Sequence, residues 1–207
     1  MIHGIGVNFD RLNIDNLDGI RKKYRMEMRI PQDAEVLIYV AEILKNKNQQ
    51  MLIHALKELH DKDRKMYLLL PGPDHSKSEF YKLAEDLGLK GYVKFLGWRS
   101  DIGQLMAASD MCVASSIREG FGINLVEAQY CHLPVVAVTN RGHRAIIKDG
   151  ENGFLVPMND SKAMANRVLE VMDNKELYDR LANVNVDEYK CENIAKTIYG
   201  YLQEVVK

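Results

Sequence analysis

Residues 111–138 read MCVASSIREGFGINLVEAQYCHLPVVAV, and this stretch decides the fold of the chain. It begins and ends with short apolar runs, 111–114 and 135–138, which are typical of buried strands. Residues 122–131, between them, are numerous enough for a helix. Strands of nearly unbroken apolar character joined by a helix are typical of parallel neighbours with a right-handed crossover.

The same alternation extends toward the N-terminus. Apolar runs predict further strands at 36–40, 66–70 and 92–96. Helices are predicted at 47–60, 79–87 and 101–108, the first from apolar residues at helical spacing and the second with Gly88 as its stop. We therefore predict an α/β fold with a doubly wound parallel sheet, Rossmann-like, covered by helices on both faces.

The two ends of the chain differ from this middle. Residues 1–30 contain a glycine loop at 3–6 and a basic helix near 20–24, without an opening strand. After Pro157 the sequence predicts only helices, at 163–172, 177–181 and 194–206. We find no internal repeat, low-complexity tract or linker, which indicates one domain.

Composition excludes several classes of protein. The chain has 28 basic and 29 acidic residues and a pI near 6.6, so a nucleic-acid partner is not expected. Its three cysteines show no metal-site spacing and predict buried thiols in a reducing compartment. No apolar run approaches the roughly 18 residues of a membrane span, and no secretory signal is present. A cytoplasmic protein is expected.

The loop at 115–122 is the candidate ligand site, because ligands of doubly wound sheets bind at the carboxyl ends of strands. Gly120 and Gly122 allow a tight turn, and the amides that open the next helix can hold a diphosphate without a metal. Glu119 precedes that helix and Glu127 lies about a turn and a half inside it. The two carboxylates could accept hydroxyls from ribose and from a sugar, one on each side of the diphosphate, which indicates a nucleotide sugar.

Residues 115–138, SSIREGFGINLVEAQYCHLPVVAV, and 140–156, NRGHRAIIKDGENGFLV, resemble the donor-binding half of retaining glycosyltransferase family 4. The family signature is a pair of glutamates separated by seven residues, as at Glu119 and Glu127. The resemblance points to bacterial capsule and exopolysaccharide transferases. Further stretches match the family in its order, namely IHGIGVNFDRL from residue 2, LIYVAEILKNKNQQMLIHAL from 37, LLLPGPD from 68 and YVKFLGWRSDIGQLMAASDMCV from 92.

The resemblance implies a role for each matching residue. Glu127 would bind the nucleotide ribose and Glu119 would lie near the transferred sugar. Lys47 would contact the diphosphate and stabilise the leaving group, so it and Glu119 form the predicted catalytic pair. The remaining predicted donor contacts are Gly120, the backbone amides of Phe121, Gly122 and Ile123, and the loop beside the base, Gly97, Trp98 and Arg99. No metal and no cofactor are implied besides the donor, expected to be a UDP-sugar.

The resemblance also implies the organisation of the whole enzyme. Family members have the GT-B plan of two Rossmann-like domains with the active site between them. This chain, 1–207, would be the donor-binding C-terminal domain, with 1–30 on the interdomain side, 186–207 as a crossover helix, and the N-terminal acceptor domain absent. The chain alone would be inactive. The full enzyme would pass a hexose or related sugar to a glycan or lipid-linked acceptor in surface polysaccharide synthesis, with peripheral membrane association.

Two positions depart from the family pattern. Glu42 stands where members often have an arginine that accompanies the lysine, and Arg141 or Arg144 could substitute for it. Residues 141–145, RGHRA, lack the acid of the usual Gly-Gly-x-x-Glu pattern, which leaves sugar specificity open.

Simpler interpretations remain for these residues. Glu127 could be a solvated helix residue, Glu119 a loop charge paired with Arg118, Lys47 a solvated lysine, and Trp98 a cover for the sheet edge. Residues 61–63, DKD, imitate a metal motif but end a helix far from the glycine loop, and His3 and His143 lack zinc-site spacing. A non-catalytic nucleotide-sugar-binding or regulatory module with the same fold is the alternative function, and a purely structural domain is a third.

Overall fold

The centre of the molecule is a sheet of six parallel strands in the order β3-β2-β1-β4-β5-β6. The computed structural model describes residues 5–205. Strand β1 lies in the middle, where Leu37 pairs with Leu68 on one side and with Met111 on the other. The strands are β1 (Val36–Ile38), β2 (Tyr67–Pro71), β3 (Val93–Gly97), β4 (Met111–Ala114), β5 (Val135–Val138) and β6 (Phe154–Val156). The predicted doubly wound sheet is confirmed.

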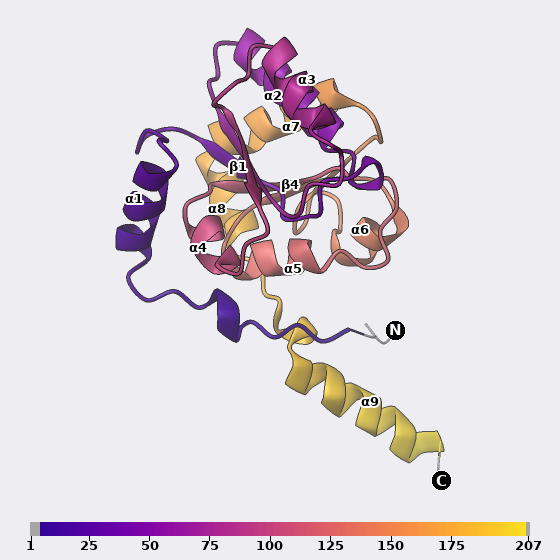
Figure 1. The fold of residues 1–207 in the computed structure, drawn as a ribbon. Helices are drawn as coiled ribbons and strands as arrows, with labels where there is room; N and C mark the ends of the chain where they lie inside the picture. The colour runs from indigo at the N-terminus through magenta and orange to yellow at the C-terminus, as the bar shows by residue number, and fades with distance from the viewer. Residues whose placement is uncertain (1–4, 206–207) are drawn as a thin grey trace.

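Helices cover both faces of the sheet (Figure 1). Helices α2 (Gln49–Asp61), α3 (Glu79–Asp86) and α7 (Ser161–Asp173) lie together on one face, where α2 packs on both α3 and α7. The other face carries α4 (Ile102–Ala107), α5 (Ile123–Tyr130) and α6 (Arg141–Ile146). Because the central strands are covered on both sides, β1, β4 and β5 are buried along their whole length, as their apolar runs predict.

Near the glycine loop, the structure differs from the sequence prediction in two elements and in the start of one helix. β6 and α6 were not predicted: β6 has only three residues, and α6 forms where Asn140 accepts a hydrogen bond from the amide of His143. The helix predicted over 47–60 begins at Gln49. Asn48 has a left-handed backbone with φ 56°, which separates α2 from a short 3-10 helix, η2 (Lys45–Lys47). Lys47 therefore ends a turn of its own instead of opening α2.

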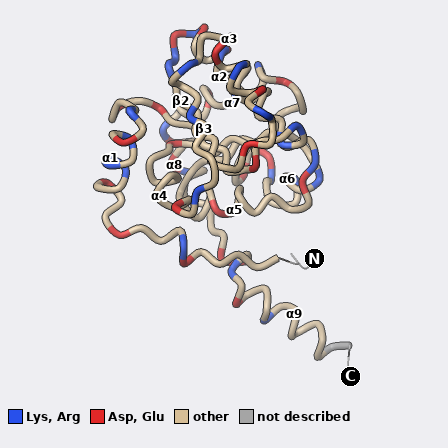
Figure 2. The backbone as a smooth tube through the Cα atoms, viewed as in Figure 1, with Lys and Arg blue, Asp and Glu red and all other residues tan. Residues whose placement is uncertain are grey.

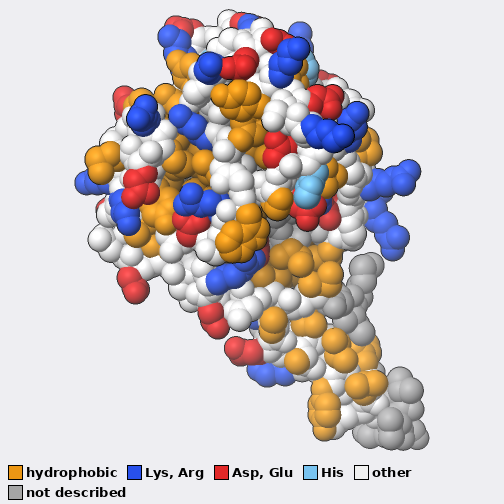
Figure 3. All heavy atoms as spheres, viewed as in Figure 1, with side chains coloured by type: hydrophobic (Ala, Val, Ile, Leu, Met, Phe, Trp, Pro, Cys, Tyr) orange, Lys and Arg blue, Asp and Glu red, His pale blue; other side chains and the backbone are white. Residues whose placement is uncertain are grey.

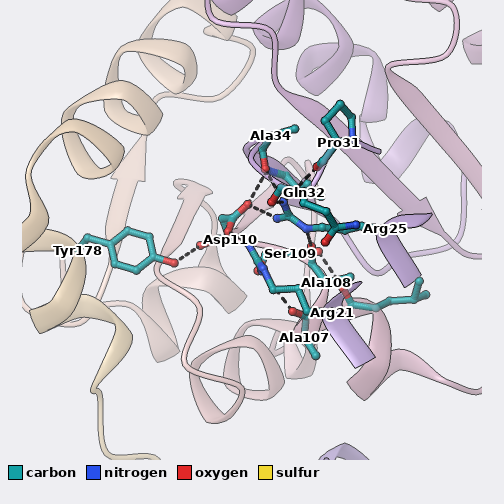
Figure 4. Close-up of polar contacts among 12 residues, drawn as sticks. Arg21, Arg25, Pro31, Gln32, Ala34, Ala107, Ala108, Ser109, Asp110 and Tyr178 are labelled. Carbon is teal, nitrogen blue, oxygen red and sulfur yellow. Dashed lines mark hydrogen bonds and ion pairs between the residues drawn. The ribbon is translucent and has the colours of Figure 1, made fainter. Parts of the chain in front are cut away.

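The basic helix predicted near 20–24 is α1 (Leu17–Glu27), which packs against α4 at the side of the sheet. Its Arg25 is completely buried, and the guanidinium donates to the carboxylate of Asp110 at 2.8 Å. Asp110 also accepts from the amide of Val36 at 2.7 Å, and the hydroxyl of Tyr178 donates to its carbonyl at 2.8 Å (Figure 4). This cluster therefore holds α1 to the amino ends of the two central strands.

The described ends of the chain run side by side below the sheet. The amide of Val7 donates to the carbonyl of Tyr189 at 2.7 Å, within the 3-10 helix η3 (Asp187–Tyr189). Another 3-10 helix, η1 (Asp10–Leu12), packs against α4, whereas α8 (Lys175–Ala182) follows α7. The last helix, α9 (Cys191–Val205), projects away from the body (Figure 1). His3 lies outside the described residues.

Helix α9 carries an apolar surface that the body of the protein does not cover. Figure 3 shows hydrophobic side chains gathered along it. Ile198, Tyr199, Tyr201 and Leu202 are all exposed. Charged residues elsewhere are of both signs and interspersed (Figure 2). Within residues 5–205, none of the helices combines the length and the apolarity needed to cross a bilayer.

Candidate functional site

The candidate site lies where the strand order changes direction, between the carboxyl ends of β1 and β4. Tyr39 follows β1 and Ser116 follows β4, and their hydroxyl oxygens are 2.6 Å apart. Asn140, after β5, donates to the carbonyl of Ser116 at 2.8 Å. In doubly wound sheets this position opens a crevice for ligands. Tyr39, Ser116 and Asn140 were not predicted as site residues, although Tyr39 lies within the predicted strand 36–40 and the other two lie two residues beyond predicted strands.

Lys47 and Glu119 meet at these strand ends. The Lys47 ammonium donates to Oε2 of Glu119 at 2.7 Å, and the hydroxyl of Ser116 donates to the same oxygen at 3.1 Å. Two hydrogen bonds join the segment of Lys47 to that of Glu119. The Ser115 hydroxyl donates to the carbonyl of Lys47 at 2.8 Å, and the Ile117 amide donates to the carbonyl of Asn46 at 2.8 Å. The two predicted catalytic residues, 72 positions apart, are thus neighbours.

Glu119 is ionised at neutral pH. Burial acts to raise the pKa of its carboxyl group, but the hydrogen bond and charge of Lys47 and the Ser116 hydroxyl together hold the pKa below its usual value. The pair is partly shielded, since the Lys47 and Glu119 side chains are 24% and 20% exposed. A polar ligand can therefore reach both charges.

The glycine loop leads directly into α5. Gly122 has φ +87°, a conformation that favours glycine, and it caps α5 without any side-chain hydrogen bond. The first amides of α5 consequently lack a side-chain acceptor and can bind an anion. Around Gly120 nothing lies within 4 Å of an added Cβ, so the loop is open there. The ring of Phe121 contacts Tyr189 edge-on, with centroids 5.9 Å apart.

Glu127 lies on the buried side of α5, apart from the pair of Lys47 and Glu119. Its side chain is only 5% exposed and forms an ion pair with Arg11 of η1. Burial raises the pKa of Glu127, and the charge of Arg11 opposes that rise. The two glutamates thus have different partners, and Arg11 was not anticipated from the sequence.

The predicted base-side loop follows β3, the edge strand of the sheet. Gly97 ends β3 with φ +64°, and Trp98 is 73% exposed. Arg99 makes two hydrogen bonds to Asp101, the one from Nε being 2.7 Å long, and Asp101 also accepts from the hydroxyl of Tyr24 at 2.8 Å. Asp101, which precedes α4, therefore links α4 to α1, and Arg99 is paired with it. A role of Arg99 at the base stays a prediction.

Asp101→Asn is expected to destabilise the protein by about 1 kcal/mol at pH 7, a value reduced by solvent screening of this partly exposed pair. The hydrogen bond from Arg99 lowers the pKa of Asp101 from 3.8 to about 2. Because the folded pKa is the lower one, this stabilisation is present above pH 3.8 and is lost as the pH falls toward 2. Urea unfolding of the unaltered protein and of Asp101→Asn at pH 7 and at pH 2 tests this prediction. An equal difference in stability at the two pH values would contradict it.

His143 is a second buried polar residue beside the loop. Its Nδ1 lies 2.8 Å from the carbonyl of Val138, whereas its buried Nε2 has no hydrogen-bond partner among the described residues. Its Cδ2 would lie 3.3 Å from a Cβ added to Gly122. Burial lowers the pKa of His143, so the ring is neutral at neutral pH. The His143 ring therefore packs against Gly122 of the glycine loop.

The charged residues at the two departures from the family pattern lie at the surface. Glu42 is exposed, and so are Arg141 and Arg144 on α6. Asp61, from the metal-like run 61–63, forms an ion pair with Lys57. Residues 5–205 contain no cluster of three histidine, cysteine or acidic side chains that could hold a metal ion.

Fold and candidate site together define a Rossmann-like α/β protein whose polar residues meet at a glycine loop. The model of the family described as "Glycosyl transferases group 1" matches residues 20–185, and the chain belongs to this family. One relative is EpsD of Bacillus subtilis, provisionally described as a glycosyltransferase, which is 41% identical over 181 residues. That match covers 87% of this chain and 47% of EpsD.

Two further relatives extend the comparison. The lipopolysaccharide core biosynthesis glycosyltransferase LpsE of Rhizobium meliloti is 32% identical over 158 residues, which cover 76% of this chain and 45% of LpsE. The crystal structure of Anabaena HepE in complex with UDP and glucose superimposes with a TM-score of 0.85 at 26% identity. It covers 96% of this chain and 55% of HepE. The chain thus spans about half the length of the relatives it matches.

Proposed function

We propose that this chain is the donor-binding domain of a retaining glycosyltransferase, with a nucleotide sugar as its ligand. The observation that carries the proposal is the Lys47–Glu119 pair, held at the carboxyl ends of β1 and β4 beside the start of α5, which has no side-chain cap. The crystal structure of HepE contains UDP and glucose, which supports a UDP-sugar as the donor. No step of this proposal requires a metal or an additional cofactor.

In the proposed complex the diphosphate lies against the α5 amides that follow Gly122 and against Lys47. When it binds, Lys47 exchanges Glu119 for the phosphates, and Glu119 is then free to accept hydrogen bonds from the transferred sugar. As the bond between the sugar and the diphosphate breaks, negative charge grows on the departing nucleoside diphosphate. Lys47 and the helix amides stabilise that charge. Glu127 accepts from the ribose, and Gly97, Trp98 and Arg99 lie on the side of the base.

Transfer also needs an acceptor site, which we propose lies in a second Rossmann-like domain of the GT-B type. Its contact surface on this chain would include the exposed apolar residues of α9, from Ile198 to Leu202. The name of LpsE, a glycosyltransferase of lipopolysaccharide core biosynthesis, supports a role in surface polysaccharide synthesis. We propose a cytoplasmic location and a glycan or lipid-linked acceptor for the full enzyme. We expect negligible transfer by this chain alone.

The test is calorimetric titration of the chain with UDP, UDP-glucose and a GDP-sugar. We expect Glu127→Ala to weaken UDP-glucose binding by about 1 to 3 kcal/mol, because a charged hydrogen-bond acceptor is lost. Glu176→Ala, at an exposed helical glutamate on α8, is the matched control and should leave affinity unchanged. No heat with any nucleotide, or equal affinity of Glu127→Ala and the unaltered chain, would overturn the proposal.

A further inference from the structure

Arg11 reaches Glu127 from a distant part of the sequence. The two residues are 116 positions apart, yet the guanidinium forms an ion pair with Oε1 of Glu127. The contact is asymmetric, since the Glu127 side chain is 5% exposed and that of Arg11 is 55% exposed. An exposed cation is therefore paired with a carboxylate that is almost completely buried.

The other carboxylate oxygen of Glu127 is open. Among the described residues no side chain or amide donates to Oε2, and this oxygen is not fully buried. A carboxylate can accept through both oxygens, so Arg11 on Oε1 does not prevent a ligand hydroxyl from reaching Oε2. The arrangement leaves room for one more donor.

Arg11 is the group that favours the charged form of Glu127. Burial raises the pKa of Glu127, and the attraction and hydrogen bond of Arg11 are the influences that lower it. The other titratable groups that face it are the thiols of Cys112 on β4 and Cys131 after α5, both neutral because burial raises each pKa to about 12. Neither thiol can replace the positive charge of Arg11.

The segment that carries Arg11 is fixed against α5 on both sides of the arginine. The ring of Phe9 stacks on Tyr130, with centroids 4.1 Å apart. The hydroxyl of Tyr130 donates to Oδ1 of Asn13 at 2.6 Å. These contacts fix the position of Arg11 relative to Glu127.

We propose that Arg11 is a positioning residue of the donor site, which holds Oε1 of Glu127 in an ion pair and directs its open oxygen Oε2 toward the hydroxyl groups of the nucleotide ribose. This inference rests on the proposed function, because it assumes that Glu127 is the ribose acceptor. It adds residues 9–13 to the donor site, although they lie far from the glycine loop in the sequence. Arg11 itself contacts Glu127 and not the nucleotide.

The test measures UDP-glucose affinity between about pH 6 and pH 8 for the unaltered chain, Arg11→Gln, Arg11→Lys and the control Lys22→Gln. The diphosphate of UDP-glucose is esterified at both ends, to ribose and to glucose, so it does not titrate in this range. Without Arg11 the pKa of Glu127 rises further, and its protonated form accumulates as the pH falls. We expect Arg11→Gln to bind about tenfold more weakly at pH 6 and less than about threefold more weakly at pH 8.

Arg11→Lys should restore most of the affinity at pH 6, since a lysine also carries the charge. Lys22→Gln removes a cation from the exposed surface of α1 and should follow the unaltered chain at every pH. Parallel pH profiles for Arg11→Gln and the unaltered chain would overturn the proposal. A uniform loss that is independent of pH would do the same, because it would indicate a structural role only.

A second probe, 2′,3′-dideoxy-UDP, reports on the ribose contact directly. Against UDP, the missing hydroxyls should cost the unaltered chain about tenfold in affinity at pH 6, and Arg11→Gln less than about threefold. An equal penalty in both proteins would contradict the inference. Glu127→Ala separates the two proposals: if it leaves binding intact, the donor site itself is wrong, whereas if it weakens binding while Arg11→Gln does not, only the role of Arg11 fails.

Discussion

Replacing Arg25 with methionine is expected to destabilise the protein by about 3 to 5 kcal/mol, the usual cost of removing one partner of a buried ion pair. Arg25 is 0% exposed and donates to the carbonyls of Ala108, Gln32 and Ala34 at 3.0, 2.8 and 2.6 Å. Methionine fills similar space but satisfies none of these oxygens. It also leaves the carboxylate of Asp110 with Arg21 as its remaining cation (Figure 4).

Urea unfolding at neutral pH measures this loss. Lys22→Met, on the exposed side of the same helix, is the matched control and should change stability by less than about 0.5 kcal/mol. Asp110→Asn combined with Arg25→Met should cost less than the two separate losses added together, because the residues share one network. A loss below about 1 kcal/mol for Arg25→Met would show that the cluster does not hold α1 to the strands.

Gly142→Ala is expected to destabilise the protein by about 1 to 3 kcal/mol, the range for overpacking a close contact. In a helix, alanine normally improves stability by about 1 kcal/mol over glycine. Here the added Cβ would lie 2.6 Å from the carbonyl oxygen of Glu119 and 2.8 Å from its carbonyl carbon. Backbone atoms cannot rotate away, so the loop that carries Glu119 must shift. We expect UDP-glucose affinity to fall about tenfold with it.

Gly200→Ala is the matched control for this change. Gly200 is a glycine of α9 with nothing within 4 Å of an added Cβ, so alanine there should stabilise the helix slightly and leave affinity unchanged. Thermal unfolding and calorimetry of the two variants test the prediction together. If Gly142→Ala proved as stable as Gly200→Ala and bound UDP-glucose normally, the packing of α6 against the Glu119 loop would not determine the site.

Most of the sheet could be predicted because the signals for its strands are local. The apolar runs at 36–40, 66–70, 92–96, 111–114 and 135–138 each contain or overlap an observed strand. β6 could not be predicted in the same way. It has three residues, and it is a strand because Leu155 lies in register with Ala137 of β5. Pairing with β5, and not its own composition, makes this segment extended.

The site was predictable in part. The glycine loop and the start of α5 were located from sequence, because a left-handed glycine before a helix is a local requirement. The roles of Lys47, Glu119 and Glu127 came from the family resemblance and stay predictions. The neighbourhood of each could not be inferred. Arg11 resembles any other loop arginine until η1 packs beside α5, and Arg118, the local partner considered for Glu119, is replaced by Lys47.

The sequence by itself determined the alternation of strands and helices, the glycine turn and the spacing of the two glutamates, because each follows from neighbouring residues. Only the tertiary structure decided which charges meet. The ends of β1 and β4 become neighbours at the change of strand order, and this brings Lys47 to Glu119 across 72 residues. Burial of α5 under the N-terminal segment likewise gives Glu127 its partner, since a carboxylate taken out of water is stable only beside a cation.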